Sequence, residues 1–256
     1  MQNIPKQGEW GKRIREGFIA EQGFSLVSFD YSQMELRIVA HLSGDKQMRL
    51  FFSSGADIHK MTAAAVFGVS EKEVTDEMRF RAKALNFGVL YGMGAQGFAK
   101  SASISIDDAR DFIEQYFVRF PKIYEYMEKA KESSRSHGYV ETMFGRRRYL
   151  PEANSNTPQL RAASERMAQN HPIQGSVADI VKMAMVELDQ TLALPKQRAR
   201  MLLQIHDELL CEIADDIVEE TSRSVKTLLE NICQLEVSLQ VDVKKGKNWG
   251  IMEKVF

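Results

Sequence analysis

The pattern of apolar and polar residues changes character near the N-terminal end of the chain. Residues 24–29 (FSLVSF) are largely apolar and predict a short strand that ends at Asp30. From Met34 to Leu42 the apolar residues recur at helical spacing instead. We therefore expect Asp30 to lie at a strand-to-helix junction.

A second strand-like region, residues 202–213 (LLQIHDELLCEI), contains two apolar runs that are interrupted by His206, Asp207 and Glu208. The two runs predict a hairpin. Tight turns favour Asn-Gly or Asp-Gly because these residues tolerate positive φ angles, yet this turn has no glycine. A lone acidic turn is usually just solvated, so these three residues need a partner elsewhere in the chain before they indicate chemistry.

Helical patterns dominate the middle of the chain, from about residue 57 to residue 137. Within this stretch, residues 70–73 have the Ser-x-x-Glu form of a capping box, and residues 75–77 (TDE) are an equally suitable helix start. A small hairpin around Phe144 and Gly145 is predicted next.

The C-terminal part mixes helical and strand patterns. A helix is predicted from about residue 157 to 170, with an interruption at Pro172 and a further helix to about residue 192. Residues 235–243 alternate strictly between apolar and polar and predict a half-buried strand. An amphipathic helix is predicted between the hairpin and this strand, with inward-facing residues Ile217, Val225, Leu228, Leu229 and Ile232.

Strand patterns therefore occur at both ends of the chain, with a long helical stretch between them. This order predicts an α+β protein in which one β-containing layer carries a mostly α-helical insertion.

Composition narrows the class of protein without identifying a function. The 256 residues are 44% hydrophobic and 27% charged, which is typical of a soluble globular protein of one or two compact units. No apolar run is long enough to cross a bilayer, and Cys211 and Cys233 do not form a CxxC pair. We expect a cytoplasmic protein without a membrane partner, a metal cluster or a disulfide framework. The net charge of -1 gives no overall sign of a nucleic-acid partner.

Asp30 is the candidate partner of the acidic turn. If its strand pairs beside the hairpin, Asp30 and Asp207 could face each other at the edge of one sheet. Two close carboxylates repel each other unless a cation lies between them. Carboxylate oxygens, completed by waters and substrate phosphates, are the ligands that Mg²⁺ prefers, and two such ions can support phosphoryl transfer.

A third segment, residues 79–92 (RFRAKALNFGVLYG), places two cations and two aromatic residues at every fourth position. Arg79, Lys83, Phe87 and Tyr91 form one slowly turning stripe on a helix. Two cations followed by two aromatic rings suit a ligand with a phosphate end and a flat base. A half-buried helix with a solvated basic end is the alternative interpretation.

Three segments together resemble the polymerase motifs of the family A DNA polymerases, the bacterial DNA polymerase I group. They are DYSQMELR at Asp30 to Arg37, the Arg79–Tyr91 helix, and His206, Asp207 and Glu208. They occur in the order of that family and at closely similar spacing, and the likeness covers nearly the whole chain. The resemblance implies a DNA-directed DNA polymerase that acts in DNA replication or repair. Such an enzyme is a nucleotidyltransferase: it moves a nucleotide from a dNTP to a primer 3′-hydroxyl and releases pyrophosphate.

The resemblance also implies the catalytic residues. Asp30 and Asp207 would hold two Mg²⁺ ions, for which Mn²⁺ can substitute. Glu208 would be a supporting carboxylate, and Lys83 would donate a proton to the leaving pyrophosphate.

A further set of positions would bind the incoming nucleotide. Arg79 and Lys83 would bind its phosphates with help from His59, and Phe87 would pack on its sugar and base. Glu35 would fill the space that a ribose 2′-hydroxyl needs, unless it is only an exposed helix residue paired with Arg37. The whole nucleotide-binding set is Arg79, Lys83, Phe87, Tyr91, His59, Glu35 and Gln33.

The remaining matched residues would contact the primer–template DNA. Donors in the minor groove meet acceptors that every base pair presents, so they can check pair geometry without reading sequence. A structural role is almost equally suitable for the histidine of the acidic turn, and a proline interrupts the spacing of the helical residues. The DNA-binding set is Arg37, Arg166, Asn170, Gln174 and His206.

In that family, an antiparallel-sheet palm carries helical fingers. Residues 1–40 and 160–256 would form the palm, and residues 41–159 the fingers. The likeness begins in the middle of the polymerase domain, so the thumb and nuclease regions are expected to be absent. A fragment, a truncated reading frame and one half of a split enzyme, with the missing N-terminal polymerase portion as a separate chain, all stay open. A catalytically weak DNA- or nucleotide-binding fragment is the alternative function.

Overall fold

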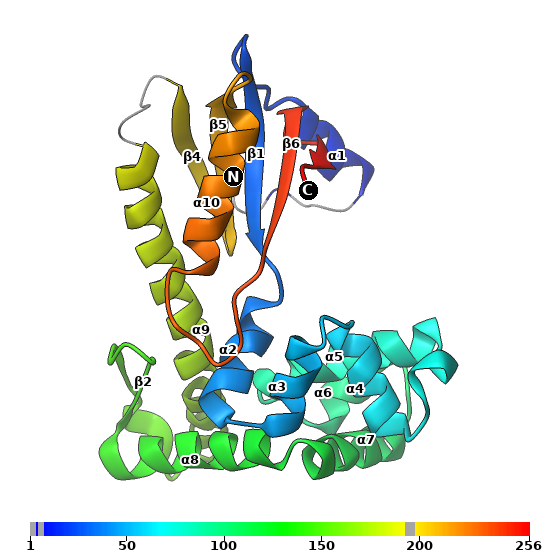
Figure 1. Cartoon of the computed structure of the whole chain (residues 1–256). Coiled ribbons are helices and arrows are strands. Elements are labelled where there is room, and N and C mark those ends of the chain that lie inside the picture. The colour runs from blue at the N-terminus through cyan, green and yellow to red at the C-terminus, as the bar shows by residue number, and fades with distance from the viewer. Residues whose placement is uncertain (1–3, 5–7, 193–197) are drawn as a thin grey trace. The chain divides into compact units, whose positions relative to one another are not determined.

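The chain forms two compact units in the computed structural model, which describes residues 4, 8–192 and 198–256. A sheet unit comprises Met1–Met34 and Val177–Phe256, and a helical unit comprises Glu35–Ser176. Figure 1 shows the elements of both units. The palm and fingers boundaries near residues 40 and 160, which the resemblance implied, stay a prediction.

The sheet unit is built on a five-stranded sheet in the order β4-β5-β1-β6-β7, and each neighbouring pair is antiparallel. The hairpin predicted around the acidic turn is confirmed as β4 and β5. The strands are β1 (Phe24–Tyr31), β4 (Ala199–Ile205), β5 (Glu208–Ala214), β6 (Val241–Asn248) and β7 (Ile251–Lys254). The unit also contains α1 (Glu9–Glu16), α10 (Val218–Glu230) and the part of α9 (Pro158–Leu192) from Val177 onward.

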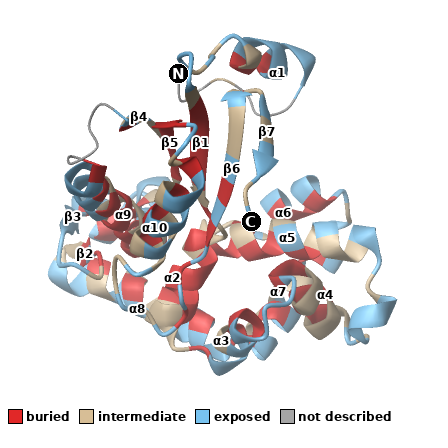
Figure 2. Cartoon of the chain, turned by 45° about the horizontal axis from the view of Figure 1, so that its top comes forward, coloured by how far each residue is buried: buried red, intermediate tan, exposed pale blue. Residues whose placement is uncertain are grey.

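Alternate side chains of β1 face opposite sides of the sheet. Phe29 and Tyr31 are buried on the side covered by α10, and the Tyr31 hydroxyl donates to a backbone carbonyl of α10 at 3.0 Å. Ser28 and Asp30 lie on the other side, where Ser28 Oγ donates to Glu208 Oε1 at 2.7 Å. Figure 2 shows that β1 is buried along nearly its whole length.

Apolar packing on the side of Ser28 fixes the register of the strands. Leu26, Ile205, Leu210 and Trp249 form a buried cluster there. A slip of one residue would move these side chains to the wrong side of the sheet, so packing specifies which residues pair. The resulting register places Asp30 opposite Glu208 of β5 and opposite a residue of β6.

The helical unit confirms the helical stretch predicted for the middle of the chain. Both predicted helix starts occur: a capping box at Ser70 opens a short 3₁₀ helix, and Thr75 caps α5 by accepting from the backbone of Met78. The elements are α2 (Met34–Ser43), α3 (Lys46–Ser53), α4 (Ile58–Phe67), η1 (Glu71–Glu73), α5 (Asp76–Leu90), α6 (Ala95–Ala102), α7 (Ile106–Arg119), α8 (Pro121–His137), β2 (Tyr139–Glu141), β3 (Arg147–Tyr149) and η2 (Pro151–Asn154).

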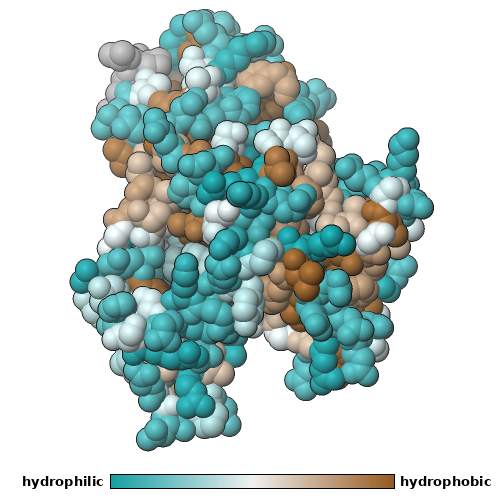
Figure 3. Space-filling model, turned by 60° about the horizontal axis from the view of Figure 1, so that its bottom comes forward, coloured by the Kyte–Doolittle hydropathy of each residue, from teal (hydrophilic) through white to brown (hydrophobic). Residues whose placement is uncertain are grey.

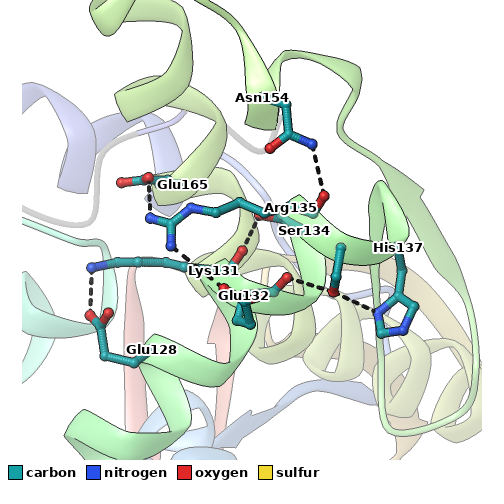
Figure 4. A network of polar contacts seen from close by, with 9 residues as sticks. Glu128, Lys131, Glu132, Ser134, Arg135, His137, Asn154 and Glu165 are labelled. Carbon is teal, nitrogen blue, oxygen red and sulfur yellow. Dashed lines mark hydrogen bonds and ion pairs between the residues drawn. The ribbon is translucent and has the colours of Figure 1, made fainter.

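The small hairpin predicted around Phe144 and Gly145 is confirmed as β2 and β3. Polar contacts beside it connect α8 with the first part of α9, as Figure 4 shows. Arg135 of α8 forms an ion pair with Glu165 of α9, and the Asn154 side chain donates to the carbonyl of Arg135 at 2.7 Å. This network holds the segment of α9 that carries the predicted minor-groove residues.

The predicted strand over residues 235–243 is wrong in its first part. Only its last residues belong to β6, which begins at Val241, although Val237 and Leu239 are buried as the alternation predicted. The reason is the length of the neighbouring strand: β1 ends at Tyr31, opposite Val241, so the residues before Val241 have no strand to pair with. Alternating burial therefore continues without a ladder of hydrogen bonds.

The predicted interruption at Pro172 is also wrong, because α9 runs through the proline as one helix. Proline removes one backbone donor and disfavours a helix interior. The neighbouring residues Ala168 and Ile173 are buried, and their packing holds the helix together at this point. The spacing of Arg166, Asn170 and Gln174 is consequently a true helical spacing.

The predicted α+β fold is confirmed. No helix in the described residues is long and apolar enough to cross a membrane. On the face drawn in Figure 3, hydrophobic patches are scattered over a largely hydrophilic surface.

Candidate active site

The acidic turn and the end of β1 meet in the sheet unit. Asp30 is paired with Glu208, and the backbone N–H of Tyr31 donates to the carbonyl of Asp207 at 3.2 Å. Asp30 and Asp207 are both half-buried. The sequence placed Asp30 just after a strand, whereas β1 continues through it to Tyr31, so strand pairing positions both aspartates.

Glu208 differs from the two aspartates because it is buried, with only 4% of its surface exposed. Its Oε1 accepts hydrogen bonds from Ser28 Oγ at 2.7 Å and from Trp249 Nε1 at 3.4 Å. A buried carboxylate requires such donors. Ser28 and Trp249 were not singled out by the sequence, because neither belongs to a motif that indicates chemistry.

The backbone is unusual at both acidic segments. His206 and Gln33 have φ values of 57° and 53°, in the left-handed region that non-glycine residues seldom occupy. His206 and Asp207 form the two-residue loop between β4 and β5, and the Gln204 amide donates to the carbonyl of His206. Strain of this kind concentrates at functional sites. His206 is exposed, and its role stays a prediction.

The predicted stripe lies along α5 in the helical unit. Lys83 is exposed, whereas Arg79, Phe87 and Tyr91 are half-buried. Tyr91 is the C-terminal cap of α5, one residue beyond its last helical residue. A Cβ added to Gly88 would lie 3.0 Å from the sulfur of Met93, so the Met93 side chain would have to shift slightly to accommodate it.

Asp57 connects the basic end of α5 with the start of α4. Its Oδ2 accepts from Arg79 Nε at 2.7 Å, while Oδ1 accepts from the backbone N–H groups of His59 and Lys60 at 2.9 and 3.1 Å. Burial would raise the pKa of Asp57, but the hydrogen bonds from Arg79 and the backbone outweigh burial and lower it. Asp57 was missed by the sequence reading, although an aspartate before an apolar run is an N-cap signal.

His59 lies beside the stripe and is only 4% exposed. Its ring centre is 5.7 Å from that of Phe87, and Asn86 Nδ2 lies 3.1 Å from its Nδ1. Burial lowers the pKa of His59 to about 4; Arg79 and Lys83 act in the same direction, and Asp57 opposes them. His59 is therefore neutral at pH 7.

Glu35 and Tyr91 are brought together although 56 positions separate them in the sequence. The Tyr91 hydroxyl donates to Glu35 Oε2 at 2.6 Å. The guanidinium of Arg37 lies 4.6 Å from the ring centre of Phe52. Glu35 is half-buried, and its role in sugar selection stays a prediction.

The predicted DNA-binding residues differ in accessibility. Arg166 and Gln174 are exposed, and Asn170 is half-buried, on the single helix α9. Arg37 is only 4% exposed, and its guanidinium contacts the ring of Phe52. Contact of these residues with DNA stays a prediction.

The acidic edge of the sheet is the end of strands β1 and β5 where Asp30, Asp207 and Glu208 lie. It fits a hard divalent cation. Within the described residues, no group of three or more His, Cys, Asp and Glu side chains is arranged to hold a metal ion. Mg²⁺ is commonly held by one or two carboxylates, with waters and substrate phosphates as its other ligands. Asp30 and Asp207 offer that donor set, without the sulfur or nitrogen ligands that would favour zinc.

The fold is that of part of a polymerase domain. The chain resembles the POL domain of Pol1 from M. smegmatis, which was solved in complex with DNA primer-template and dNTP. The TM-score is 0.93 and the sequence identity is 43%, over 98% of this chain and 44% of that chain.

Residues 1–251 match the description of DNA polymerase family A. The chain is 49% identical to DNA polymerase I of Deinococcus radiodurans, over 97% of this chain and 26% of the relative. It is 47% identical to the thermostable DNA polymerase I of Thermus aquaticus, over 97% of this chain and 30% of the relative. The chain belongs to DNA polymerase family A, and it spans between a quarter and a third of the length of these relatives.

Proposed function

We propose that this chain carries out template-directed nucleotidyl transfer, adding the nucleotide of a dNTP to the 3′-hydroxyl of a DNA primer. The observation that supports this best is the strand pairing that brings Asp30 opposite Glu208 and next to Asp207. The family membership and the basic, aromatic face of α5 support the same activity.

In this proposal, Asp30 and Asp207 would hold two Mg²⁺ ions through their carboxylate oxygens. Such ions lower the pKa of the attacking hydroxyl and stabilise the charge that develops on the leaving group. Glu208 is buried and bonded to Ser28 and Trp249, so it supports the shape and charge of the edge. The sheet unit would be the catalytic palm and the helical unit the fingers.

The face of α5 would bind the dNTP. Lys83 and Arg79 neutralise triphosphate oxygens, and Phe87 packs against the sugar and base. Arg79 is paired with Asp57 in the structure, so phosphate would compete with that carboxylate for its guanidinium. As the 3′-hydroxyl loses its proton to water and its oxygen bonds to the α-phosphorus, the bond to the bridging oxygen would break, and Lys83 would donate a proton to the leaving pyrophosphate.

Glu35 would select the sugar by occupying the place of a 2′-hydroxyl. The Tyr91 hydroxyl, which donates to Glu35 at 2.6 Å, holds the carboxylate in a defined position. Exclusion of the wrong substrate by an occupied volume is a common means of specificity.

A single-turnover primer extension tests the proposal. The chain, in excess over a labelled hairpin template, is mixed with one dNTP and Mg²⁺ at low salt, because phosphate contacts weaken as salt rises. We expect addition of the templated nucleotide and none with a mismatched dNTP. A folded chain that binds the hairpin and the dNTP but adds nothing would contradict the proposal.

A second candidate function is binding of DNA and nucleotide without efficient catalysis. The same experiment separates the two functions, since the second predicts a bound dNTP without an extended primer.

A further inference from the structure

A buried polar chain lies behind the proposed phosphate-binding face of α5. Asn86 and Thr62 are completely buried, and His59 is nearly so. Asn86 Nδ2 is 3.1 Å from both His59 Nδ1 and Thr62 Oγ1. Thr62 Oγ1 is in turn 2.8 Å from the carbonyl oxygen of Ile58. These contacts connect α5 with α4. Which atom donates in one hydrogen bond determines which atom can donate in the neighbouring one.

The direction of the hydrogen bonds follows from the single proton of Thr62. Its hydroxyl can donate to the Ile58 carbonyl at 2.8 Å or to Asn86 Oδ1 at 3.4 Å, and the shorter contact takes the proton. The hydroxyl oxygen then accepts from Asn86 Nδ2. The second N–H of the amide consequently points to Nδ1 of His59, which must be an acceptor.

The reverse orientation of the Asn86 amide is less favourable. It would place Oδ1 between Thr62 and His59 and turn both N–H groups toward the former position of Oδ1. Among the described residues, the only hydrogen-bonding contact of Asn86 Oδ1 is the 3.4 Å contact with Thr62. Two buried N–H donors would lose good acceptors, which costs more than one weakly satisfied oxygen.

We propose that Asn86 is a positioning residue, which holds His59 as a neutral imidazole with its proton on Nε2, so that Nε2–H donates to a phosphate oxygen of the bound nucleotide. This inference rests on the proposed function, because it assigns His59 to the phosphate-binding face. No described residue hydrogen-bonds to Nε2, so this nitrogen is left for a ligand.

The electrostatic surroundings agree with a neutral donor at this position. The charged groups that act on His59 are Asp57 from the N-terminus of α4 and Arg79 and Lys83 from α5. A third cation beside this arginine and lysine would be repelled, and burial also disfavours the imidazolium. A neutral N–H adds a hydrogen bond to phosphate without adding charge, and its protonation does not change near pH 7.

The first arm of the test measures the tautomer directly, without nucleotide. Two-bond ¹H–¹⁵N correlations of the ¹⁵N-histidine-labelled chain distinguish a protonated ring nitrogen from an unprotonated one. The spectrum of His59→Gln identifies the His59 signals among the five histidines. We expect unprotonated Nδ1 and protonated Nε2 at pH 7. A proton on Nδ1 would overturn the inference, whether or not the chain is a polymerase.

The second arm of the test requires Nδ1 of His59 to donate a hydrogen bond instead of accepting one. In Asn86→Asp the carboxylate can only accept, so it should draw a proton to Nδ1 and raise the pKa of His59. Above that pKa, Nε2 is a bare lone pair that repels phosphate. The affinity for inorganic tripolyphosphate, relative to the parent at each pH, should then fall about tenfold between pH 6 and pH 8.5. An unchanged ratio and an unchanged ring spectrum would overturn the inference.

Two further variants keep the test decisive if Asn86→Asp does not fold. Thr62→Val removes the acceptor that orients the amide, so His59 should show a mixture of tautomers, whereas Thr62→Ser should keep the parent spectrum. Asn156→Asp, at an exposed asparagine of the same unit, controls for an added charge. A Thr62→Val spectrum identical to that of the parent would count against the inference. A parent with the expected tautomer but no affinity for tripolyphosphate would overturn the phosphate role alone.

Discussion

The acidic edge of the sheet and the face of α5 hold their side chains by different means. At the sheet edge, backbone pairing sets the positions: Asp30 lies opposite Glu208, and Tyr31 donates to the Asp207 carbonyl. On α5 the side chains position one another, as in the contacts of Arg79 with Asp57 and of Tyr91 with Glu35. The backbone hydrogen bonds between two strands break only when the strands separate. A contact between two side chains, in contrast, can be replaced by a contact with a ligand.

This difference determines what a substitution should do in each region. A change of charge at the sheet edge should remove chemistry while the local backbone stays in place. A change on the face of α5 should alter orientation, protonation or selectivity, because the neighbouring side chains rearrange. The expected effects below run from the largest to the smallest.

The largest effect is expected for Asp207→Asn. The substitution removes one carboxylate charge from the proposed metal-binding edge but keeps the size of the side chain, so extension should fall on the order of 10³-fold or more. Single-turnover extension measures this, and amide exchange of β5 reports whether pairing persists. Asp216→Asn, an exposed aspartate of the same unit, is the control. Near-normal extension by Asp207→Asn would refute the role of the hairpin.

Acid should affect the face of α5 through His59. The pKa of His59 is about 4 in the folded chain and about 6.5 when unfolded, so the unfolded chain binds the proton first as the pH falls. The stabilising contribution is complete above about pH 6.5 and is lost by about pH 4, with a total of about 3 kcal/mol. Urea unfolding across this window should show a shallower pH dependence for His59→Gln. Parallel curves for parent and variant would contradict the depressed pKa.

Sugar selection should distinguish the role of Glu35, which excludes the 2′-hydroxyl, from that of Tyr91, which positions Glu35. Glu35→Ala opens space for a 2′-hydroxyl, so preference for dNTP over rNTP should fall about ten- to hundredfold. Tyr91→Phe keeps Glu35 but removes the hydrogen bond at 2.6 Å, worth about 1 kcal/mol, so the fall should be only about fivefold. Competition between paired nucleotides measures both ratios. An equal or larger effect of Tyr91→Phe would show that Glu35 is not the residue that excludes.

The smallest effect concerns the backbone of the acidic turn. His206 has a φ of 57°, which a β-branched residue tolerates poorly, so His206→Val should destabilise the sheet unit by about 1 kcal/mol more than His206→Asn. Chemical denaturation compares the two variants. In the loop between β2 and β3, a positive φ is instead occupied by a glycine, Gly145 with a φ of 79°. Equal stability of the two His206 variants would mean that the turn relaxes.

The sequence predicted best those features that depend on local periodicity. The hairpin, α2 and the α5 stripe follow from the spacing of apolar and charged residues, and caps such as Thr75 carry recognisable signals. It failed where a neighbour decided the outcome. Residues 235–240 alternate like a strand, but β1 ends too early to pair with them. Pro172 reads as a break, but buried neighbours hold the helix through it.

The candidate site was predictable to the extent that its residues lie in recognisable motifs. Asp30, Asp207 and the α5 stripe were found in this way. Asn86 was not, because it lies on the buried side of the same helix as the stripe and looks like an ordinary core position. Its contact with His59 joins residues 27 positions apart and exists only once α4 and α5 have packed. The hydrogen bond between Glu35 and Tyr91 likewise could not be predicted from the sequence.

The bond between Trp249 and Glu208 provides an optical probe of the acidic edge. The sequence has two tryptophans, and Trp10 is 72% exposed, whereas Trp249 is buried with the guanidinium of Arg15 3.8 Å from its ring centre. The indole N–H of Trp249 donates to Glu208, so its emission should respond to the electric field around that carboxylate. A Trp10→Phe protein would therefore emit from a single indole beside the proposed catalytic edge. Titration of that emission with a divalent cation would follow events at the hairpin without label, primer or turnover.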